Sequence, residues 1–300
     1  MAMNLALRLL EHDGLAGLVV GPFALQEELG TGGFGVVYRG VHCDTDAKVA
    51  VKFLLPDRNG TLDVETRARF EREARLLAKL EHPSIVSLID FGEAEGLPFI
   101  ALEFVEGITL QRFLAQRAPV PSDEVARMLT QLLGALHHAH AQGTVHRDIK
   151  PSNIMLAQDE RGGLRVKLMD FGVGKNLTPH STTFHSNSRA ILGTPQYMSP
   201  EQLRTDVELT HKSDLYSLGV VAHQALCGAL PFQHITNPHQ LYAALLDARE
   251  ITLERDRIDG IDHDLADVID KLTRKDPDAR FADAGEALAW LRRVRSEAPT

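Results

Sequence analysis

Residues 146–153 read HRDIKPSN, the most informative segment of the chain. It brings together a carboxylate at Asp148, an ammonium group at Lys150 and a side-chain amide at Asn153. A carboxylate can accept or orient the proton of a hydroxyl group, and a cation beside it can neutralise charge that develops during a reaction. The octapeptide therefore predicts a catalytic loop.

A second motif, KLMDFG, follows at residues 167–172 and contains Asp170. The oxygen atoms of Asn153 and Asp170 are ligands of the kind that hard cations such as Mg²⁺ take. Singly, an Asn turn and an Asp-Phe-Gly turn are ordinary features of folded proteins. Together and in this order, the two motifs make these ordinary explanations much less probable.

Upstream, residues 30–35 read GTGGFG and place glycines at the spaced positions of a GxGxxG pattern. Glycine lets a backbone approach phosphate groups closely and present its N–H donors. Alone, the pattern also fits a tight turn or a dinucleotide-binding fingerprint, but that fingerprint should open a helix. Val36 and Val37 are strand-forming, so the pattern favours a hairpin flap over phosphates.

The run Val49-Ala50-Val51 ends in Lys52, and a helical spacing of apolar residues follows over 66–80. A lysine on a strand is most often a solvated charge, but a carboxylate on that helix could hold Lys52 extended toward phosphates. Glu73 shares the helical face of the apolar residues, whereas Glu71 points more outward. The spacing predicts a pair between Lys52 and Glu73, with a surface salt bridge as the alternative interpretation.

The pattern along the chain predicts an α+β protein. From Phe23 to Phe104 it indicates a small sheet with one helix packed on it, and after Gly107 it becomes mainly helical. The strand-like runs are residues 36–38, 49–51, 85–88 and 99–102. Residues 125–140 carry one broad apolar face, with Ser122 as the expected N-cap, and residues 178–189 form a long polar loop.

The net charge of −9 and the pI near 5.9 argue against nucleic acid as a partner. Cys43 and Cys227 lack metal-site spacing and a disulfide framework, which fits a reducing, cytoplasmic setting. The first residues carry charges that do not suit a secretory signal. We expect no membrane span, because the uncharged run 215–232 is better interpreted as a buried helix that ends near Gly228.

The motifs and their order resemble the protein kinase family, and more closely its bacterial-type serine/threonine branch, over about residues 23–293. The resemblance implies a two-lobed fold, with a small antiparallel β lobe that carries one regulatory helix and a larger, mainly helical lobe. The expected boundaries are an N-terminal extension over 1–21, a kinase domain over 22–295 with lobes 22–103 and 104–295, and a tail over 296–300.

The same resemblance implies ATP and Mg²⁺ as cofactors, with Asp148 and Lys150 as catalytic residues and Asn153 and Asp170 as metal ligands. A lysine at position 150 is similar to the branch that phosphorylates Ser and Thr, so the partners are proteins that carry such hydroxyls. The implied nucleotide-binding residues are Leu29, Gly30, Gly32, Gly33, Phe34, Gly35, Val37, Ala50, Lys52, Glu73 and the hinge between the lobes, Glu103 to Val105.

Residues 193–202, GTPQYMSPEQ, resemble the end of a kinase activation segment, with Thr194 in the substrate-binding loop and Ser199 where the family usually has Ala. The family further implies an ion pair between Glu201 and Arg280. Asp214 matches the usual helix motif, while Tyr216 stands where Trp is more common.

Arg147 precedes Asp148 and resembles the residue that binds a phosphate on the activation loop. By this resemblance the expected phosphorylation sites are Ser186 and Ser188, followed by Thr182 and Thr183. For any one of these residues, plain solubility of the loop is an equally good explanation.

The sequence thus predicts an enzyme that transfers the γ-phosphoryl group of Mg-ATP to Ser or Thr of proteins, with autophosphorylation of its own loop and a homodimer for that step. The alternative is a pseudokinase, a scaffold that binds nucleotide without transfer. Residues 1–21 could join a dimer contact, but chain ends are often poorly ordered, so we expect them to fray. A dinucleotide-dependent enzyme is disfavoured because alternating βαβ units are absent.

Overall fold

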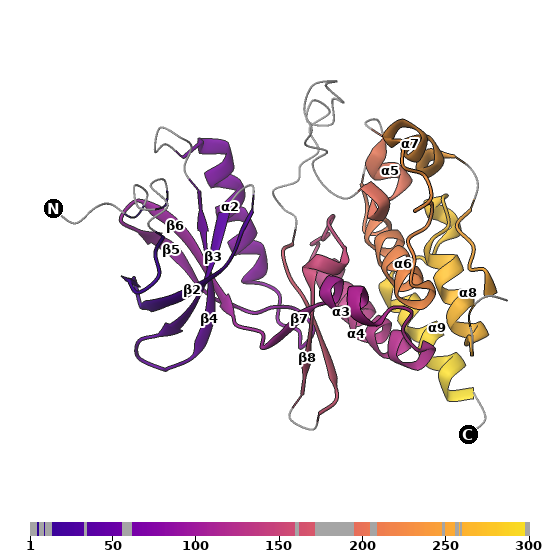
Figure 1. The fold of residues 1–300 in the computed structure, drawn as a ribbon, viewed down its shortest axis with the longest axis horizontal. Helices are drawn as coiled ribbons and strands as arrows, with labels where there is room; N and C mark the ends of the chain where they lie inside the picture. Colours follow the sequence, from indigo (N-terminus) through magenta and orange to yellow (C-terminus); the bar gives the residue numbers. More distant parts are fainter. Residues whose placement is uncertain are drawn as a thin grey trace. The chain divides into compact units, whose positions relative to one another are not determined.

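The structure is a computed structural model that describes residues 5, 9, 14–32, 35–55, 62–159, 162–171, 195–204, 209–247, 250–255, 258 and 260–297, without the side chains of 295–297. The chain divides into two compact units. The N-terminal unit comprises Met1–His82 and Val86–Glu106, and the C-terminal unit comprises Pro83–Ile85 and Gly107–Thr300 (Figure 1).

The N-terminal unit is built on a six-stranded antiparallel sheet of order β1-β2-β3-β4-β6-β5. Alternate residues of β3 and β4, among them Val36, Tyr38, Val49, Val51 and Phe53, are buried, as expected of strands with one face on a core. The strands are β1 (Val19–Val20), β2 (Phe23–Gly32), β3 (Gly35–His42), β4 (Lys48–Leu54), β5 (Leu88–Ala94) and β6 (Leu97–Glu103).

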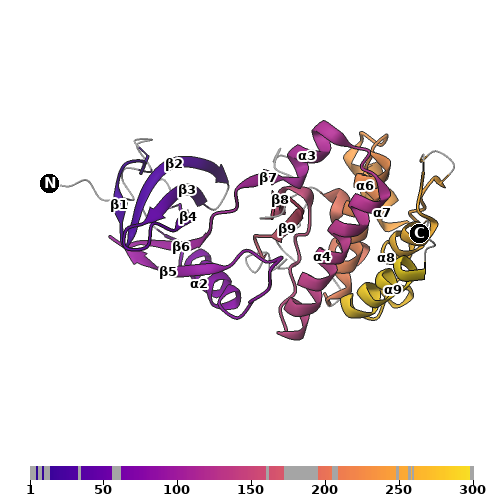
Figure 2. The ribbon, with the colours of Figure 1, turned by 90° about the horizontal axis from the view of Figure 1, so that it is seen from below.

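Helix α2 (Val64–Leu77) packs on this sheet, beside β5 and β6 in Figure 2. It begins at Asp63, whose side chain accepts a hydrogen bond from the N–H of Thr66 and caps the helix. Phe70 and Ala74 are buried against Leu54 and Ile100 of the sheet. The apolar stripe in the sequence therefore marks the face that contacts the sheet.

The N-terminal segment does not fray over residues 14–20, contrary to expectation. Leu15 is fully buried, and its N–H donates to the hydroxyl of Tyr38. Strand β1 pairs with the start of β2, Val20 opposite Phe23. The prediction was wrong because it relied only on the segment's position at the chain end. Leu15 and Val20 are buried in the core of the sheet, and this burial holds the segment in place.

The strand predicted at residues 85–88 begins later, since β5 starts at Leu88. Ile85 instead forms an isolated parallel bridge with Leu168 and belongs to the C-terminal unit. Apolar composition identified a buried segment here but not its pairing, because Ile85 is buried outside the six-stranded sheet.

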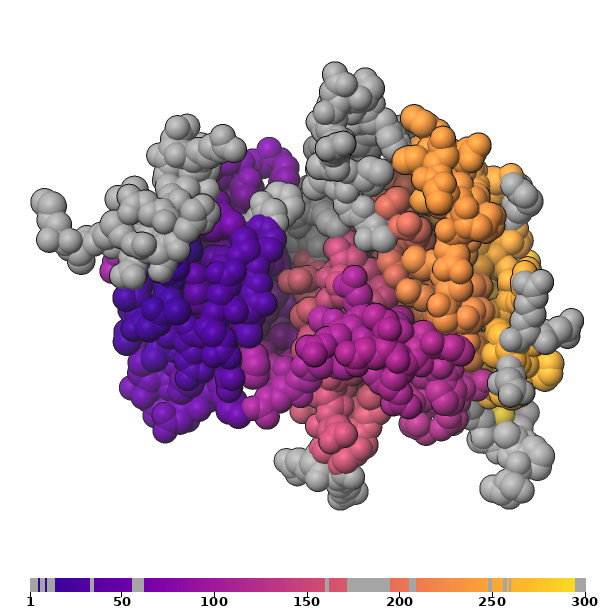
Figure 3. Space-filling view, viewed as in Figure 1, coloured from indigo at the N-terminus to yellow at the C-terminus, as the bar shows by residue number. Residues whose placement is uncertain are grey.

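The C-terminal unit is mainly helical, with a small sheet of β7 (Gly107–Thr109), β8 (Ile154–Gln158) and β9 (Leu164–Leu168). In Figure 3 its described residues form one packed surface from α3, in magenta, to α7, in orange. The α+β prediction is confirmed. The helices are α3 (Leu110–Arg117), α4 (Ser122–Ala141), α5 (Pro200–Leu203), α6 (Lys212–Cys227), α7 (Pro238–Leu246), α8 (His263–Leu272) and α9 (Ala284–Glu297).

Helix α6 is the central helix of this unit and is buried along nearly its whole length. It ends at Gly228, whose φ of +72° is the left-handed cap that glycine adopts without strain. At Gly219, an added Cβ would come within 2.8 Å of the side chains of Leu272 and Thr273, so α8 packs directly against the backbone of α6. The predicted buried helix with its end near Gly228 is confirmed.

Ser122 is not the N-cap of α4, contrary to the sequence-based prediction. The helix already includes Ser122, and Pro121 stands at the cap with no side-chain hydrogen bond. The hydroxyl of Ser122 instead donates to the carbonyl oxygen of Gly260 and accepts from the N–H of Asp262. The Ser122 hydroxyl, which the local sequence pattern assigns to the helix cap, is therefore used in a contact with residues 260–262.

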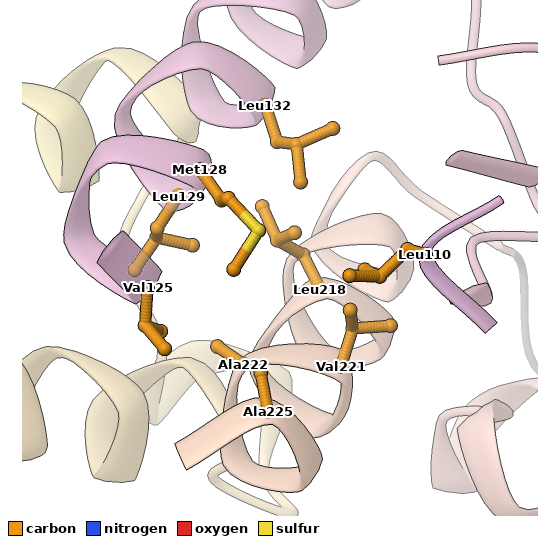
Figure 4. A pocket seen from close by; sticks show the side chains of 9 residues that line it. All are labelled: Leu110, Val125, Met128, Leu129, Leu132, Leu218, Val221, Ala222 and Ala225. Carbon is orange, nitrogen blue, oxygen red and sulfur yellow. The ribbon is translucent and has the colours of Figure 1, made fainter. Parts of the chain in front are cut away.

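Figure 4 shows an apolar cavity between α3, α4 and α6, with side chains such as Leu110, Met128 and Leu218 pointing toward a common space. Its volume is about 10 Å³, which is at the lower limit of what one water molecule needs. Because the lining is apolar and the space is small, the cavity is a packing gap and not a ligand site.

Across the part of the chain that the structure describes, no helix has both the length and the apolar character needed to cross a bilayer.

Candidate active site

The carboxylate of Asp214 on α6 anchors the loop that contains residues 146–153. One carboxylate oxygen, Oδ1, accepts from the N–H of Arg147 at 2.8 Å, and the other, Oδ2, accepts from the N–H of His146 at 2.8 Å. His140 Nε2 lies 2.8 Å from the same Oδ2, and because an ionised carboxylate only accepts, this nitrogen carries the proton. The loop is thus tied to the central helix through its own backbone.

Asp214 is 1% exposed, so its charge needs this set of donors. Burial alone would raise the pKa of Asp214, but hydrogen bonds from His140 and the backbone outweigh it and hold the pKa below its usual value. The carboxylate therefore stays ionised and keeps accepting all three bonds.

His146 is fully buried and makes two hydrogen bonds with its ring. Nδ1 accepts from the N–H of Asp148 at 3.2 Å, so Nε2, 3.0 Å from the carbonyl oxygen of Met169, must be the protonated nitrogen. Burial lowers the pKa of His146, which favours this neutral form. The ring also packs against Phe171, with 4.6 Å between the ring centroids. His146 therefore links the two motifs found in the sequence.

Asp148, Lys150 and Asn153 lie together, as their spacing predicts. Lys150 Nζ is 2.9 Å from Asp148 Oδ2. Asn153 Nδ2 donates to the main-chain oxygen of Asp148 at 2.8 Å and to its Oδ2 at 3.1 Å. One carboxylate oxygen is thus held between a cation and an amide, so the side chain of Asp148 has a defined orientation.

Arg147 and Asp170 both adopt the left-handed backbone region, with φ of +65° and +57°. Non-glycine residues rarely adopt this conformation, which costs roughly 1–2 kcal/mol and is often found at functional sites. The main chain beside Asp170 is bonded to the catalytic loop, since the N–H of Met169 donates to the carbonyl oxygen of Asn153. The two motifs are joined by backbone as well as by His146.

The residues fit a magnesium ion that is held mainly by phosphates. Asn153 uses its Nδ2 for Asp148, which directs Oδ1 away from that bond. Among the described residues, no group of three or more His, Cys, Asp or Glu side chains forms a metal cage. Mg²⁺ usually takes one or two protein oxygens and completes its shell with phosphate and water, so Asn153 and Asp170 are a suitable donor set.

In the N-terminal unit, Lys52 of β4 pairs with Glu73 of α2, with Nζ 2.9 Å from Oε1. Both side chains are largely buried, at 20% and 14% exposure. Glu71 instead pairs with Arg67 and Arg75 on the outer side of the helix. The sequence-based choice of Glu73 over Glu71 as the partner of Lys52 is confirmed.

The glycine pattern lies in the hairpin of β2 and β3, so a strand follows the glycines as predicted. At Gly35, an added Cβ would approach the carbonyl oxygen of Phe53 to 2.6 Å, so only glycine fits. Gly30 and Gly32 are exposed residues of β2, and Gly33 and Phe34 lie outside the described residues.

The expected adenine-lining residues lie on the same sheet. Val37 and Ala50 are half-buried on β3 and β4, and Leu29 is 45% exposed. Glu103 ends β6, and its N–H donates to the carbonyl oxygen of Ser87 at 3.0 Å. Val105 follows β6 and is half-buried.

The predicted ion pair between Glu201 and Arg280 is confirmed and has two parallel hydrogen bonds, of 2.6 Å and 2.8 Å. Burial favours a raised pKa of Glu201, but the Arg280 guanidinium outweighs it and lowers the pKa. Ser199 caps α5 in a capping box with Gln202. The expected phosphorylation sites Thr182, Thr183, Ser186 and Ser188, and the substrate-loop residue Thr194, lie outside the described residues.

Two residues of the site were missed by sequence reasoning. His140 is the last residue of the predicted apolar helix over 125–140, which gave it no role of its own, yet its ring bonds the carboxylate of Asp214. Gln202 follows the Ser-Pro-Glu sequence, and its amide donates to the carbonyl oxygen of Arg147 at 2.9 Å. Neither carries a local signal, because both act on residues distant in sequence.

A family model of the protein kinase domain matches residues 23–290. The serine/threonine-protein kinase pkn3 of Myxococcus xanthus is 41% identical over 215 residues, which cover 70% of this chain and 38% of pkn3. PknB of Mycobacterium leprae is 36% identical over 282 residues, which cover 92% of this chain and 43% of PknB. The chain thus spans less than half the length of either relative.

A solved structure, the kinase domain of PknI from Mycobacterium tuberculosis, matches with a TM-score of 0.68 and 28% identity. The match covers 93% of this chain and 98% of that structure. The family match extends over most of the chain and includes the anchored loop, the Lys52–Glu73 pair and the Glu201–Arg280 pair described above. The chain therefore belongs to the protein kinase family, as a catalytic domain of the bacterial serine/threonine kind.

Proposed function

We propose that this domain transfers the γ-phosphoryl group of Mg-ATP to Ser or Thr hydroxyls of proteins, with Asp148 and Lys150 as its catalytic residues. The observation that carries the proposal is the arrangement at Asp148, whose Oδ2 is within 2.9 Å of Lys150 Nζ and 3.1 Å of Asn153 Nδ2. An oriented carboxylate beside a cation is what phosphoryl transfer to a hydroxyl requires.

In this reaction the substrate oxygen forms a bond to the γ-phosphorus, and the bond from that phosphorus to the β,γ-bridging oxygen breaks, with ADP as the leaving group. Asp148 orients the hydroxyl and accepts its proton. Lys150, which lies beside Asp148, would offset the negative charge on the oxygens of the transferring phosphoryl group.

Asn153 and Asp170 would hold Mg²⁺ through side-chain oxygens. When bound, the ion neutralises charge on the phosphates of ATP. The left-handed backbone at Asp170 and the hydrogen bond from the N–H of Met169 to Asn153 support this role, because they set the positions of the two ligands relative to one another.

Lys52 would contact the α- and β-phosphates, with Glu73 holding its side chain extended. The backbone of Gly30, Gly32, Gly33, Phe34 and Gly35 would cover the phosphates, and Leu29, Val37 and Ala50 would line the adenine slot. At the hinge, the N–H of Glu103 already donates to Ser87, so its contact with adenine would use the carbonyl oxygen, with Val105 as the second hinge contact.

We also propose that the domain phosphorylates its own activation loop, on Ser186 or Ser188 first and on Thr182 or Thr183 next, with Arg147 as the partner of the phosphate. This step would take place in a homodimer. Mass spectrometry of protein co-expressed with a phosphatase, before and after addition of ATP, tests it, and the absence of any new phosphate on the loop would contradict it.

The proposed partners are proteins that present Ser or Thr beside Thr194, and not nucleic acids, since the chain has a net charge of −9. Both cysteines, Cys43 and Cys227, are free thiols, which supports a reducing, cytoplasmic setting for the activity.

The test is transfer of radiolabelled phosphate from Mg-ATP to dephosphorylated casein. We expect Asp148→Asn to lower kcat by roughly 10²–10⁴-fold, because loss of a general base has effects of that size. Lys52→Met should also lower transfer strongly. Equal transfer by the wild type and both variants would disprove the site assignment.

Glu73 and Glu71 offer a matched pair of variants on one helix. Glu73→Gln should reduce kcat/KM for ATP, whereas Glu71→Gln, which only loses bonds to Arg67 and Arg75, should leave it unchanged within about two-fold. A wild-type protein that binds Mg-ATP but transfers nothing would instead identify the domain as a nucleotide-binding pseudokinase.

A further inference from the structure

The peptide group between Arg147 and Asp148 is hydrogen-bonded at both of its ends. Its N–H, from Asp148, donates to His146 Nδ1 at 3.2 Å. Its carbonyl oxygen, from Arg147, accepts from Gln202 Nε2 at 2.9 Å. The plane of this peptide directly precedes the side chain of Asp148, so the two bonds set the direction in which that side chain leaves the backbone.

The side chain of Gln202 is buried and hydrogen-bonded at its oxygen as well as at its NH₂ group. It is 5% exposed, and its Oε1 accepts from the N–H of Ser199 at 3.0 Å and from the Ser199 hydroxyl at 3.2 Å. These bonds fix which end of the amide is oxygen, so its NH₂ group must face Arg147. The amide therefore joins the start of α5 to the catalytic loop, and both partners lie in the C-terminal unit.

The carbonyl of Arg147 needs such a donor because of the left-handed backbone at this residue. With φ at +65°, the N–H of Arg147 is directed to Asp214 and its carbonyl oxygen to Gln202. A partly buried carbonyl oxygen that loses this donor is less well satisfied, and the strained conformation at Arg147 adds to the cost of keeping the peptide in place. Removal of the donor favours a rotated peptide, and that rotation would move Asp148.

We propose that Gln202 is a positioning residue for phosphoryl transfer, which acts by holding the Arg147–Asp148 peptide and so couples α5 at the end of the activation segment to Asp148. The proposal rests on the proposed function, since it assigns the effect to the reacting carboxylate. A side chain that positions a catalytic group changes kcat more than substrate affinity, because misplacement of about 1 Å can cost roughly 100-fold in rate.

Two Gln202 variants and one control separate this role from a purely structural one. Gln202→Met keeps the volume but has neither donor nor acceptor. Gln202→Glu keeps the acceptor for Ser199 but places an anionic oxygen against the carbonyl of Arg147. Ser199→Ala removes the cap hydroxyl of α5 and one of the two bonds to Gln202 Oε1, while the bond from the Ser199 N–H still orients the amide toward Arg147.

With casein and saturating Mg-ATP, we expect Gln202→Met to lower kcat roughly 10–100-fold with KM for ATP within about three-fold. Gln202→Glu should be at least as slow at pH 8. Its kcat relative to the wild type should rise toward pH 6, because burial raises the pKa of a glutamate and the protonated acid regains a donor. The relative kcat of Gln202→Met should stay flat with pH, and Ser199→Ala should remain within about two-fold of wild type.

A second readout does not depend on activity. In ¹⁵N-labelled protein, the amide resonance of Asp148 should move in both Gln202 variants and stay in place in Ser199→Ala. Wild-type kcat in the Gln202 variants would overturn the proposal, and so would an unchanged Asp148 amide resonance. Equal loss in Ser199→Ala and Gln202→Met would also overturn it, since the cap of α5 would then explain both. If the wild type itself transfers no phosphate, the proposed function fails, while the amide resonance still tests the Gln202 contact.

Discussion

At the scale of single residues, most buried charged and polar side chains in the described part of the C-terminal unit have hydrogen-bond partners. Asp214 has three donors, and Arg280 bonds the carboxylate of Glu201 and nearby main-chain oxygens. Tyr216 is an exception within the described residues: it is fully buried on α6, and its hydroxyl has no hydrogen-bond partner there. A buried hydroxyl without a partner is a cost to the folded state.

Tyr216→Phe should therefore stabilise the domain. Removal of the unpaired hydroxyl should gain on the order of 1 kcal/mol, which corresponds to roughly 2–4 °C in Tm for a unit of this size. Differential scanning calorimetry measures the change. Tyr242→Phe is the matched control, because the hydroxyl of Tyr242 donates to the carbonyl oxygen of Leu203 and its loss should lower Tm. A lower Tm for Tyr216→Phe would show that its hydroxyl has a partner.

Sequence reasoning succeeded for residues whose geometry is local. Glu73 was chosen over Glu71 because a helix with 3.6 residues per turn puts Glu73 on the sheet side, and the structure pairs it with Lys52. Gln202 was missed for the opposite reason. Its partner, the carbonyl of Arg147, is 55 residues away and belongs to the backbone, so no residue pattern reports the contact.

At the scale of elements, the short helix α5 depends on a long-range ion pair. It has only four residues, too few to be stable alone, and begins with the Ser199 cap. Glu201 on α5 is bonded by Arg280, which follows the 3₁₀ turn η4 (Pro277–Ala279), and by the hydroxyl of Ser213. The pair is one of the contacts that fix α5 to the rest of the unit, together with the bonds from Gln202 to Arg147 and from Tyr242 to Leu203.

Arg280→Met should destabilise the domain by roughly 3–5 kcal/mol, because it leaves the Glu201 carboxylate buried without its counter-charge. The double variant Glu201→Gln with Arg280→Met should lose less than the sum of the single changes, since no charge is left unpaired. Chemical unfolding followed by circular dichroism gives these values. As a surface comparison, Arg127→Met breaks only an exposed pair with Asp123 and should cost less than about 1 kcal/mol.

Strand and helix ends were the least predictable part of the elements. The apolar run at residues 85–88 was taken for a strand, but only Leu88 joins β5, and Ile85 bridges to Leu168 instead. Ser122 fitted an N-cap by type, yet its hydroxyl bonds the loop at residues 260–262. In both places a contact distant in sequence outweighed a local preference.

At the scale of the whole molecule, two buried histidines, His146 and His223, make the free energy of unfolding depend on pH in the mildly acidic range. Burial lowers the pKa of both His146 and His223 below the usual 6.5. The unfolded chain therefore binds protons below about pH 6.5 that the folded chain does not bind, so stability falls as pH falls from there toward the folded-state pKa. The pKa values of Asp214 and Glu201 are lowered as well, so these carboxylates stay ionised in this window.

Tm of the wild type should therefore decrease steadily from pH 7 to pH 5, with each of the two histidines contributing up to about 1.4 kcal/mol per pH unit. His223 lies on α6, away from the catalytic loop. The Sγ atom of Cys227 is 3.8 Å from His223 Nε2. His223→Gln removes one of the two titrating groups, so the slope of Tm against pH should become shallower even where Tm itself is lower. His234→Gln changes an exposed histidine and should leave the slope as it is. Equal slopes in the wild type and His223→Gln would mean that His223 binds protons to the same extent in the folded and the unfolded chain, and that the acid sensitivity arises elsewhere.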